Sequence, residues 1–321
     1  MIALVGLVVP GEAQVGHFRT AAGRADYLDA YEQVLQQLPA PSSTTDVPTA
    51  YGSVRVYEWS ASPSQPVADA APPVLLLPGR TSGAPMWRDN LPALLGHRRV
   101  LAVDALGDAG LSAQTVPITS TADQAAWLDD VLDDVSPGAP VHLVGHSFGG
   151  ATAAAYARTR PDRVASLALL EPVFTLGSPP ASIYLWSALV LLPAPRSWRD
   201  EALRRIGGTD EEPRGDLGGR SATADDPLTR MIDVGAEQYT AKLPTPAVLD
   251  DTDLARLTMP VYVAIGGAES LAGGRAAART ARTHLPDPTV RVWPGTSHSL
   301  PFQVPGELGA ELADFWRSAD H

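Results

Sequence analysis

The sequence of 321 residues contains no cysteine. This absence excludes disulfides, thiolate zinc sites and cysteine nucleophiles together. It leaves the cellular compartment open, because a protein without thiols is compatible with reducing and oxidising surroundings alike. Basic residues are also scarce: 24 lysines and arginines face 36 acidic residues, which gives a formal net charge of −12. Such a surface repels nucleic acid and anionic lipid, so we expect neither as a partner.

Long hydrophobic runs are missing as well. Residues 2–9 are apolar, but no lysine or arginine precedes them and no convincing small-residue cleavage site follows, so a signal peptide is not favoured. The other apolar stretch, Ile183–Leu192, is too short to span a bilayer. We therefore expect a soluble protein without a membrane span, located in the cytoplasm, with secretion as the alternative.

Hydrophobic residues are plentiful, at 45% of the chain against 19% charged residues, which is ample for a sizeable core. Between Phe18 and Leu38 the apolar residues recur at mostly helical spacing and predict an amphipathic helix that ends near Pro39. A polar linker follows, and then the β-branched and aromatic run Val54–Trp59 predicts an edge strand. Residues 1–49 are thus predicted to form a helical N-terminal extension.

Short apolar runs then alternate with helix-like stretches. Wholly apolar strands that are separated by helices are typical of a parallel sheet covered on both faces. We therefore predict an α/β protein with a mostly parallel central sheet and helices on both faces. The predicted strands are Val74–Leu77, Val100–Val103, Val141–Val144, Val164–Leu170, Val261–Ile265 and Val290–Trp293, and the predicted helices are Met86–Leu95, Ala122–Val135, Ala151–Arg158, Arg275–His284 and Leu308–Phe315.

The alternation is interrupted over residues 172–257. This interval holds the apolar helical piece Ile183–Leu192, a loop rich in glycine and aspartate, and a second helical piece, Leu228–Tyr239. An insertion of this length is too long for a plain connection, so we expect it to fold as a helical lid after the sixth strand. The core then comprises residues 50–171 and 258–321, and no separate second domain is predicted.

One predicted strand runs directly into Gly145-His146-Ser147-Phe148-Gly149, and a helical pattern follows. The pattern G-x-S-x-G is a weak signal alone, but a buried strand before it and a helix after it are the context that a nucleophile elbow needs. Small residues at Gly145 and Gly149 let the turn close and leave the Ser147 hydroxyl exposed. The Phe148 N–H then lies at the helix N-terminus, where it can face an oxyanion. A glycine-rich turn with an incidental serine is the alternative.

With this elbow the sequence resembles the α/β-hydrolase superfamily over residues 50–317, and it is also similar to bacterial carboxylesterases. The resemblance implies that the turn Pro78-Gly79-Arg80 supplies a second oxyanion donor, the backbone N–H of Arg80, with Thr81 as the alternative. It also implies that His298, in the loop before the last helix, is the catalytic base. Asp104, His142 and His146 are expected to have structural roles.

Two glutamates compete for the third position of the triad. In the family the acid usually follows the strand predicted at Val261–Ile265, and there Glu269 occupies that position. Glutamate is an accepted alternative to aspartate in this fold. Some family members instead carry the acid at the end of the preceding strand, where this chain has Glu171. We expect Glu269 to be the acid, with Glu171 as the alternative.

A serine at the elbow favours acyl chemistry, because the superfamily's dehalogenases and epoxide hydrolases carry aspartate there. We expect a small-molecule carboxylic ester to be cleaved through an acyl-enzyme on Ser147, without metal or cofactor. Met86 and Trp87 after the oxyanion turn, and Trp186 in the lid, favour a hydrophobic acyl or alcohol part. The alternatives are an acyltransferase, thioesterase or cofactor-free perhydrolase with the same triad, and a non-catalytic relative that binds a ligand. The oligomeric state is not predicted.

Overall fold

The structure, a computed structural model, describes residues 14–60, 71–96, 98–179 and 226–320. Its central sheet has the strand order β11-β10-β8-β7-β4-β5-β3-β2, with β6 paired to β3. Neighbouring strands are parallel from β11 to β5, whereas β3 and β2 are antiparallel to their neighbours. The mostly parallel sheet that the sequence predicts is therefore confirmed. The strands are β2 Ser43–Thr49, β3 Gly52–Trp59, β4 Val74–Leu77, β5 Val100–Val103, β6 Ala113–Gln114, β7 Val141–His146, β8 Val164–Leu170, β10 Val261–Gly266 and β11 Pro288–Trp293.

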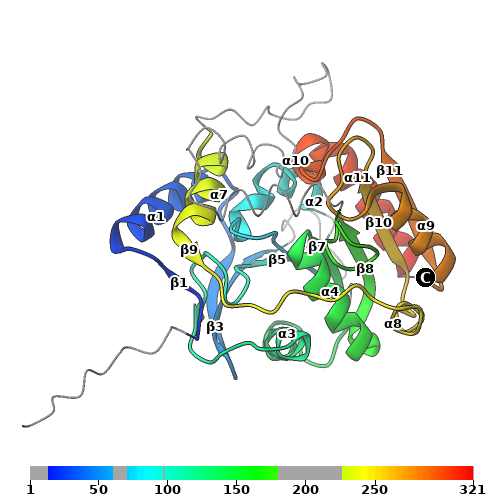
Figure 1. The fold of residues 1–321 in the computed structure, drawn as a ribbon, viewed down its shortest axis with the longest axis horizontal. Coiled ribbons are helices and arrows are strands. Elements are labelled where there is room, and N and C mark those ends of the chain that lie inside the picture. Colours follow the sequence, from blue (N-terminus) through cyan, green and yellow to red (C-terminus); the bar gives the residue numbers. More distant parts are fainter. Residues whose placement is uncertain (1–13, 61–70, 97, 180–225, 321) are drawn as a thin grey trace, which may run out of the picture.

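Helices cover both faces of this sheet, because consecutive residues of each apolar strand point to opposite sides. In β4, Leu75 and Leu77 pack into a cluster completed by α3, α4, α8 and α9, while Val74 and Leu76 pack into a cluster completed by α1, η1, α2 and α11. Figure 1 shows these two layers of helices. The helices are α1 Ala21–Leu35, the 3₁₀-helix η1 Ala84–Asp89, α2 Leu91–Leu94, α3 Thr121–Val135, α4 Phe148–Thr159, the 3₁₀-helix η2 Pro161–Arg163, α8 Asp251–Ala255, α9 Gly274–His284, α10 Leu300–Gln303 and α11 Pro305–Ala319.

The edge of the sheet differs from the prediction. Residues 43–49, expected to be part of a polar linker, form the edge strand β2, so β3 lies inside the sheet. Only Val47 of β2 is buried, and the strand therefore lacks the alternation of apolar residues by which strands are recognised. Pro48 is tolerated there because an edge strand leaves one row of N–H groups unpaired. The sheet thus begins within the predicted N-terminal extension.

The predicted helix Met86–Leu95 is divided in two. The 3₁₀-helix η1 ends at Asp89, and α2 starts at Leu91 with Pro92 in its first turn. Proline lacks the N–H that would continue the preceding helix, but it is well suited to the first turn of a new one. The break keeps both pieces short and places η1 directly after the turn that contains Arg80.

The C-terminal part of the predicted lid, where the sequence predicts the helical piece Leu228–Tyr239, packs against the N-terminal helix. Helix α7 (Pro227–Gln238) packs along α1, and the short strand β9 (Tyr239–Thr240) pairs with β1 (His17–Phe18), as Figure 1 shows. The insertion follows β8, which is the sixth strand in chain order along the main path of the sheet. The other predicted pieces, Ile183–Leu192 and the loop rich in glycine and aspartate, lie outside the described residues. Within the described ranges, no helix has the length and apolar character needed to cross a membrane.

Candidate active site

Ser147 occupies the sharp turn between β7 and α4 that the sequence predicts. Its backbone has φ 54° and ψ −117°, a left-handed conformation that costs a non-glycine residue about 1–3 kcal/mol. A Cβ atom on Gly145 would lie 2.4 Å from the Gly149 carbonyl oxygen, and one on Gly149 would lie 2.4 Å from the Pro78 carbonyl oxygen. Both positions therefore require glycine, and the turn they allow presents Ser147 at the end of the sheet.

His298 contacts this serine. Its Nε2 lies 2.9 Å from Ser147 Oγ, and the residue belongs to the loop between β11 and α10. The His298 side chain is only 14% exposed, so the pair is largely shielded from water. A neutral imidazole at this distance can accept the hydroxyl proton and turn serine into a nucleophile.

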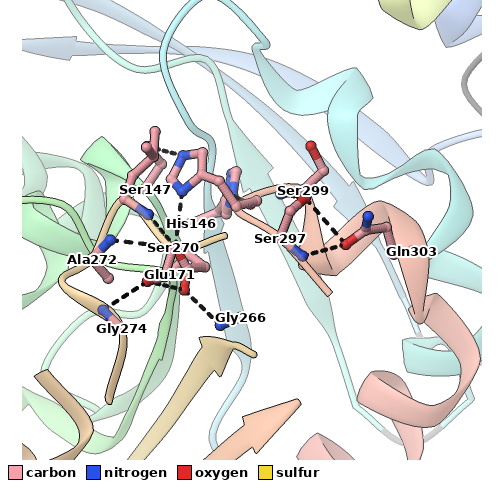
Figure 2. Close-up of polar contacts among 12 residues, drawn as sticks. His146, Ser147, Glu171, Gly266, Ser270, Ala272, Gly274, Ser297, Ser299 and Gln303 are labelled. Carbon is pink, nitrogen blue, oxygen red and sulfur yellow. Dashed lines mark hydrogen bonds and ion pairs between the residues drawn. The ribbon is translucent and has the colours of Figure 1, made fainter. Parts of the chain in front are cut away.

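The loop that carries His298 is held from two directions. The Ser297 N–H donates to Gln303 Oε1 at 2.8 Å, a contact drawn in Figure 2, and the Thr296 hydroxyl donates to the Trp293 carbonyl at 2.9 Å. On the other side, His146 Nε2 donates to the His298 carbonyl at 3.0 Å. The backbone of the candidate base is thus fixed by its own loop and by the elbow.

His146 makes this contact as a neutral ring. Burial lowers the pKa of His146 to about 3, and the positive charge of His298, when protonated, acts in the same direction. A carbonyl oxygen only accepts, so the hydrogen of the neutral ring must reside on Nε2. The structural role expected for His146 corresponds to this contact, which holds the backbone of His298.

Glu171, not Glu269, lies beside His298. The Glu171 Oε2 is 3.2 Å from His298 Nδ1, and the side chain is completely buried at the end of β8. Glu269 is exposed to solvent in the turn after β10. The expectation that Glu269 holds this position is therefore wrong, and the alternative, Glu171, holds it. One sequence feature favours this placement: Glu171 directly follows an uninterrupted apolar strand.

The reason lies in the turn after β10, which supplies hydrogen-bond donors instead of an acid. Glu171 Oε1 accepts from the Gly266 N–H at 2.6 Å and from the Ser270 hydroxyl at 2.7 Å, and Oε2 accepts from the N–H groups of Leu271 and Ala272 at 3.0 and 3.3 Å. Figure 2 shows Gly266, Ser270 and Ala272 around the carboxylate. Because β8 and β10 are neighbours, the turn after one strand reaches the residue after the other. A buried carboxylate needs such partners, and this one has them.

The backbone N–H groups predicted to face an oxyanion belong to two turns. Phe148 is the first residue of α4, so its N–H has no acceptor within the helix. In the other turn the N–H of Gly79 donates to Met86 Sδ at 3.3 Å and that of Thr81 to Asp108 Oδ2 at 3.0 Å. These contacts use the N–H groups on both sides of Arg80 and argue against the alternative, Thr81. The turn lies against the nucleophile, since a Cβ on Gly79 would be 3.4 Å from Ser147 Cβ.

The residues expected to line a substrate pocket are placed differently. Met86 and Trp87 in η1 are 0% and 1% exposed and pack into the core, so they form no open wall in this structure. Apolar residues that are near a site in the sequence can pack into the core as readily as they can line a pocket, and Met86 and Trp87 pack into the core. Met86 instead contacts the turn Pro78-Gly79-Arg80, because its sulfur accepts a hydrogen bond from the Gly79 N–H. Trp186 lies outside the described residues.

Asp104 has the structural role expected of it. It is buried, and its carboxylate accepts from the N–H of Ala84 at 2.7 Å, from that of Leu111 at 2.6 Å and from the Tyr31 hydroxyl. Burial raises the pKa of Asp104. Among the described residues, no group of three or more histidine or acidic side chains could hold a metal ion.

Comparisons with known proteins agree with this architecture. The carboxylesterase YbfK of Bacillus subtilis (strain 168) is 24% identical over 296 residues, which span 90% of this chain and 93% of that protein. The crystal structure of naproxen esterase (carboxylesterase NP) from Bacillus subtilis matches with a TM-score of 0.77 at 22% identity and covers 92% of this chain and 99% of that one. The YbfK crystal structure matches with a TM-score of 0.76 at 23% identity and covers 92% of this chain and 98% of that one.

A strand-to-helix elbow with a serine at its tip, a histidine loop after β11 and a mostly parallel sheet are thus combined in one chain. The sequence profile of the Alpha/beta hydrolase family matches residues 74–312, the part of the chain that contains the elbow, the histidine loop and every parallel strand of the sheet. The protein belongs to the alpha/beta hydrolase family.

Proposed function

We propose that the protein is a carboxylic-ester hydrolase that acts through an acyl-enzyme on Ser147. The observation that carries the proposal is the continuous contact from Ser147 Oγ through the His298 ring to Glu171, at 2.9 and 3.2 Å. This is the arrangement in which a base activates a serine and a carboxylate orients the base. The similarity to a carboxylesterase over 90% of the chain supports the same activity.

In the first half of the reaction, His298 Nε2 accepts the Ser147 proton while Oγ attacks the ester carbonyl carbon. The N–H groups of Phe148 and Arg80 donate to the oxyanion, each such donor contributing about 3–4 kcal/mol to the transition state. Glu171 stabilises the imidazolium as it forms. The imidazolium then protonates the leaving alcohol, and the acyl group remains on Ser147.

In the second half, His298 deprotonates a water molecule, which attacks the acyl-enzyme through the same oxyanion and releases the carboxylic acid. The step regenerates the serine hydroxyl and the neutral imidazole. The substrate class we propose is an ester with a hydrophobic acyl or alcohol part. Because Met86 and Trp87 pack into the core, its support is the apolar sequence Ile183–Leu192 of the predicted lid alone.

The test is the variant Ser147→Ala, assayed with p-nitrophenyl esters of increasing acyl chain length. We expect hydrolysis to fall to the background rate for every ester while the melting temperature stays near that of the wild type. An organophosphonate should label the wild-type protein, and peptide mapping should place the label on Ser147. Undiminished hydrolysis by the alanine variant would show that the nucleophile is another residue.

A further inference from the structure

We propose that Ser82 and Asp108 are positioning residues of the oxyanion hole. They hold two successive peptide groups of the turn that presents the Arg80 N–H, and so fix the direction in which this N–H points. The inference rests on the proposed ester hydrolysis, because it concerns the same site. Neither residue belongs to the motifs by which the triad is recognised.

Ser82 acts on the peptide group that carries the Arg80 N–H. The Ser82 Oγ donates to the Gly79 carbonyl oxygen at 2.9 Å, lies 3.2 Å from the Arg80 carbonyl oxygen, and belongs to a side chain that is only 3% exposed. In a trans peptide the carbonyl and the following N–H point in opposite directions. A hydroxyl that holds the Gly79 carbonyl on one side therefore turns the Arg80 N–H to the other side.

Asp108 acts on the next peptide group. Its Oδ2 accepts from the Thr81 N–H at 3.0 Å, and its Oδ1 accepts from the Ala109 N–H at 2.8 Å. The carboxylate is nearly buried, with 4% of the side chain exposed, so its charge is weakly screened and its hydrogen bonds are strong. The peptide group between Arg80 and Thr81 therefore cannot rotate without breaking the hydrogen bond from the Thr81 N–H to Asp108.

The Arg80 side chain, which this carboxylate contacts, connects the two oxyanion donors. Asp108 Oδ2 lies 3.3 Å from Arg80 Nε, and the Arg80 guanidinium carbon lies 5.0 Å from the centre of the Phe148 ring. That separation is within the range of a cation–π contact. Arg80 and Phe148, whose backbones supply the two N–H groups, are therefore also held together by their side chains.

The turn needs these contacts because its backbone is strained. Thr81 is β-branched, yet its φ is 60°, a conformation that such residues adopt only when their surroundings impose it. The Thr81 hydroxyl donates to the Arg80 carbonyl at 2.8 Å and adds a local restraint. Without Ser82 or Asp108, the turn can relax to a conformation that directs the Arg80 N–H away from the substrate.

The experiment compares an ester with its thionoester, in which sulfur replaces the carbonyl oxygen, for the wild type, Ser82→Ala and Asp108→Asn. Sulfur accepts hydrogen bonds weakly, so an intact oxyanion hole favours the oxygen ester, and a misaligned hole loses this preference. For both variants we expect kcat for the ester to fall about 10- to 100-fold with little change in KM, and the ester-to-thionoester ratio to fall with it.

The matched control is Ser166→Ala. This serine is also buried, and its Oγ lies 2.8 Å from His142 Nδ1. It is near the N-terminal end of β8, whereas the turn with Arg80 follows the C-terminal end of the parallel strand β4. The Ser166→Ala variant loses a buried hydrogen bond, as Ser82→Ala does, but its ester-to-thionoester ratio should stay at the wild-type value. Melting temperatures of all variants show how much stability each substitution removes.

Failure of the inference and failure of the proposed function would give different results. A wild-type ratio in Ser82→Ala and Asp108→Asn, whether or not kcat falls, overturns the inference, because a merely structural role lowers both rates alike. If Ser82→Ala does not fold, Asp108→Asn decides alone. Absence of ester hydrolysis and of Ser147 labelling in the wild type overturns the proposed function itself.

Discussion

Backbone strain is concentrated at the residues of the candidate site. Four non-glycine residues of the described chain have positive φ, and three of them are Thr81, Ser147 and Glu171, at 60°, 54° and 47°. Each conformation is held by hydrogen bonds from other segments, such as that from the Ser147 N–H to the Leu170 carbonyl at 3.0 Å. Strain of this kind persists only where the surrounding structure imposes it, and it commonly marks functional positions. The candidate donors, nucleophile and acid thus lie in or beside turns whose strained backbone is held by hydrogen bonds.

The first prediction at this scale separates the two glutamates. We expect Glu171→Gln to lower kcat by about four orders of magnitude, because an amide favours the wrong tautomer of His298 and cannot stabilise the imidazolium. Glu269→Gln is the matched control, and it should keep kcat near the wild-type value, because this side chain is exposed to solvent. Both are measured by steady-state kinetics on the same p-nitrophenyl ester. A large loss in Glu269→Gln with little loss in Glu171→Gln would reverse the assignment.

At the residue scale, the sequence predicted those positions whose chemistry is tied to local context. Ser147 lies in an elbow that a strand and a helix define, and His298 in a loop before the last helix, and the structure brings the two together. The choice between Glu171 and Glu269 depends on which turn donates hydrogen bonds and which side chain faces inward. The apolar strand directly before Glu171 bears on that choice, but most of the donors in the turn after β10 are backbone groups that residue types do not reveal. Ser82 and Asp108 act through backbone groups, so no pattern of residue types reveals them.

At the scale of elements, helix α7 packs directly against the turn that contains Arg80 and Thr81. A Cβ atom on Gly235 of α7 would lie 2.9 Å from Thr81 Cβ and 3.1 Å from both the Thr81 carbonyl oxygen and Tyr27 Cε2. The Thr81 hydroxyl also lies 3.3 Å from the Ile232 carbonyl, in the same helix. The approach of α7, α1 and the turn at one point thus depends on the absence of a side chain at Gly235.

The second prediction concerns this contact. In an ordinary helix, glycine to alanine stabilises by about 1 kcal/mol. For Gly235→Ala we expect no gain in stability and a reduced kcat, because the new methyl group must displace Thr81 and with it the Arg80 N–H. Gly306→Ala in α11 is the control: no atom lies within 4 Å of its added Cβ, so stability should be equal or higher and kcat unchanged. Thermal unfolding and ester kinetics on both variants test the pair, and equal behaviour of the two would contradict it.

Elements with a strong pattern were predicted well, and those fixed by tertiary contacts were not. The limits of β4 and β5 agree residue for residue with the predicted runs, because strands buried on both faces are uniformly apolar. Strand β2 exposes most of its residues and is specified by its pairing with β3, which a local pattern does not reveal. The division between η1 and α2 follows from Pro92, a local signal that the helical spacing obscured.

At the scale of the whole molecule, two buried histidines link stability to pH. Burial lowers the pKa of His142 to about 4; the charge of Arg98 acts in the same direction and that of Asp320 opposes it. Burial likewise lowers the pKa of His146 to about 3. The His142 ring contacts Asp320, near the C-terminal end of the chain, with 3.2 Å between Nε2 and Oδ1. The His146 ring lies in the elbow. Protonation of either ring thus disfavours the native packing at a different end of the sheet.

The sign of the resulting pH dependence follows from the direction of these shifts. Both pKa values lie below the value of about 6.5 for an unfolded chain, so below that pH the unfolded state binds protons that the folded state does not. The stability contribution is complete above about pH 6.5 and is lost as the pH falls, towards about 4 for His142 and about 3 for His146. Asp104 acts in the opposite direction, because its raised pKa lets the folded chain bind a proton first.

The last prediction concerns the contribution of His142 to this pH dependence, which is measured as the difference in slope between the wild type and His142→Gln. Each histidine contributes up to about 1.4 kcal/mol per pH unit to the slope of unfolding free energy between about pH 6 and pH 4.5. His142→Gln removes one titrating group, so the slope should decrease by up to that amount, whatever the variant's stability at neutral pH. The exposed His17 supplies the control, and His17→Gln should retain the wild-type slope. Urea unfolding at a series of pH values measures all three proteins. A slope in His142→Gln equal to that of the wild type would mean that the buried ring does not resist protonation, and that the acid sensitivity of the fold arises elsewhere.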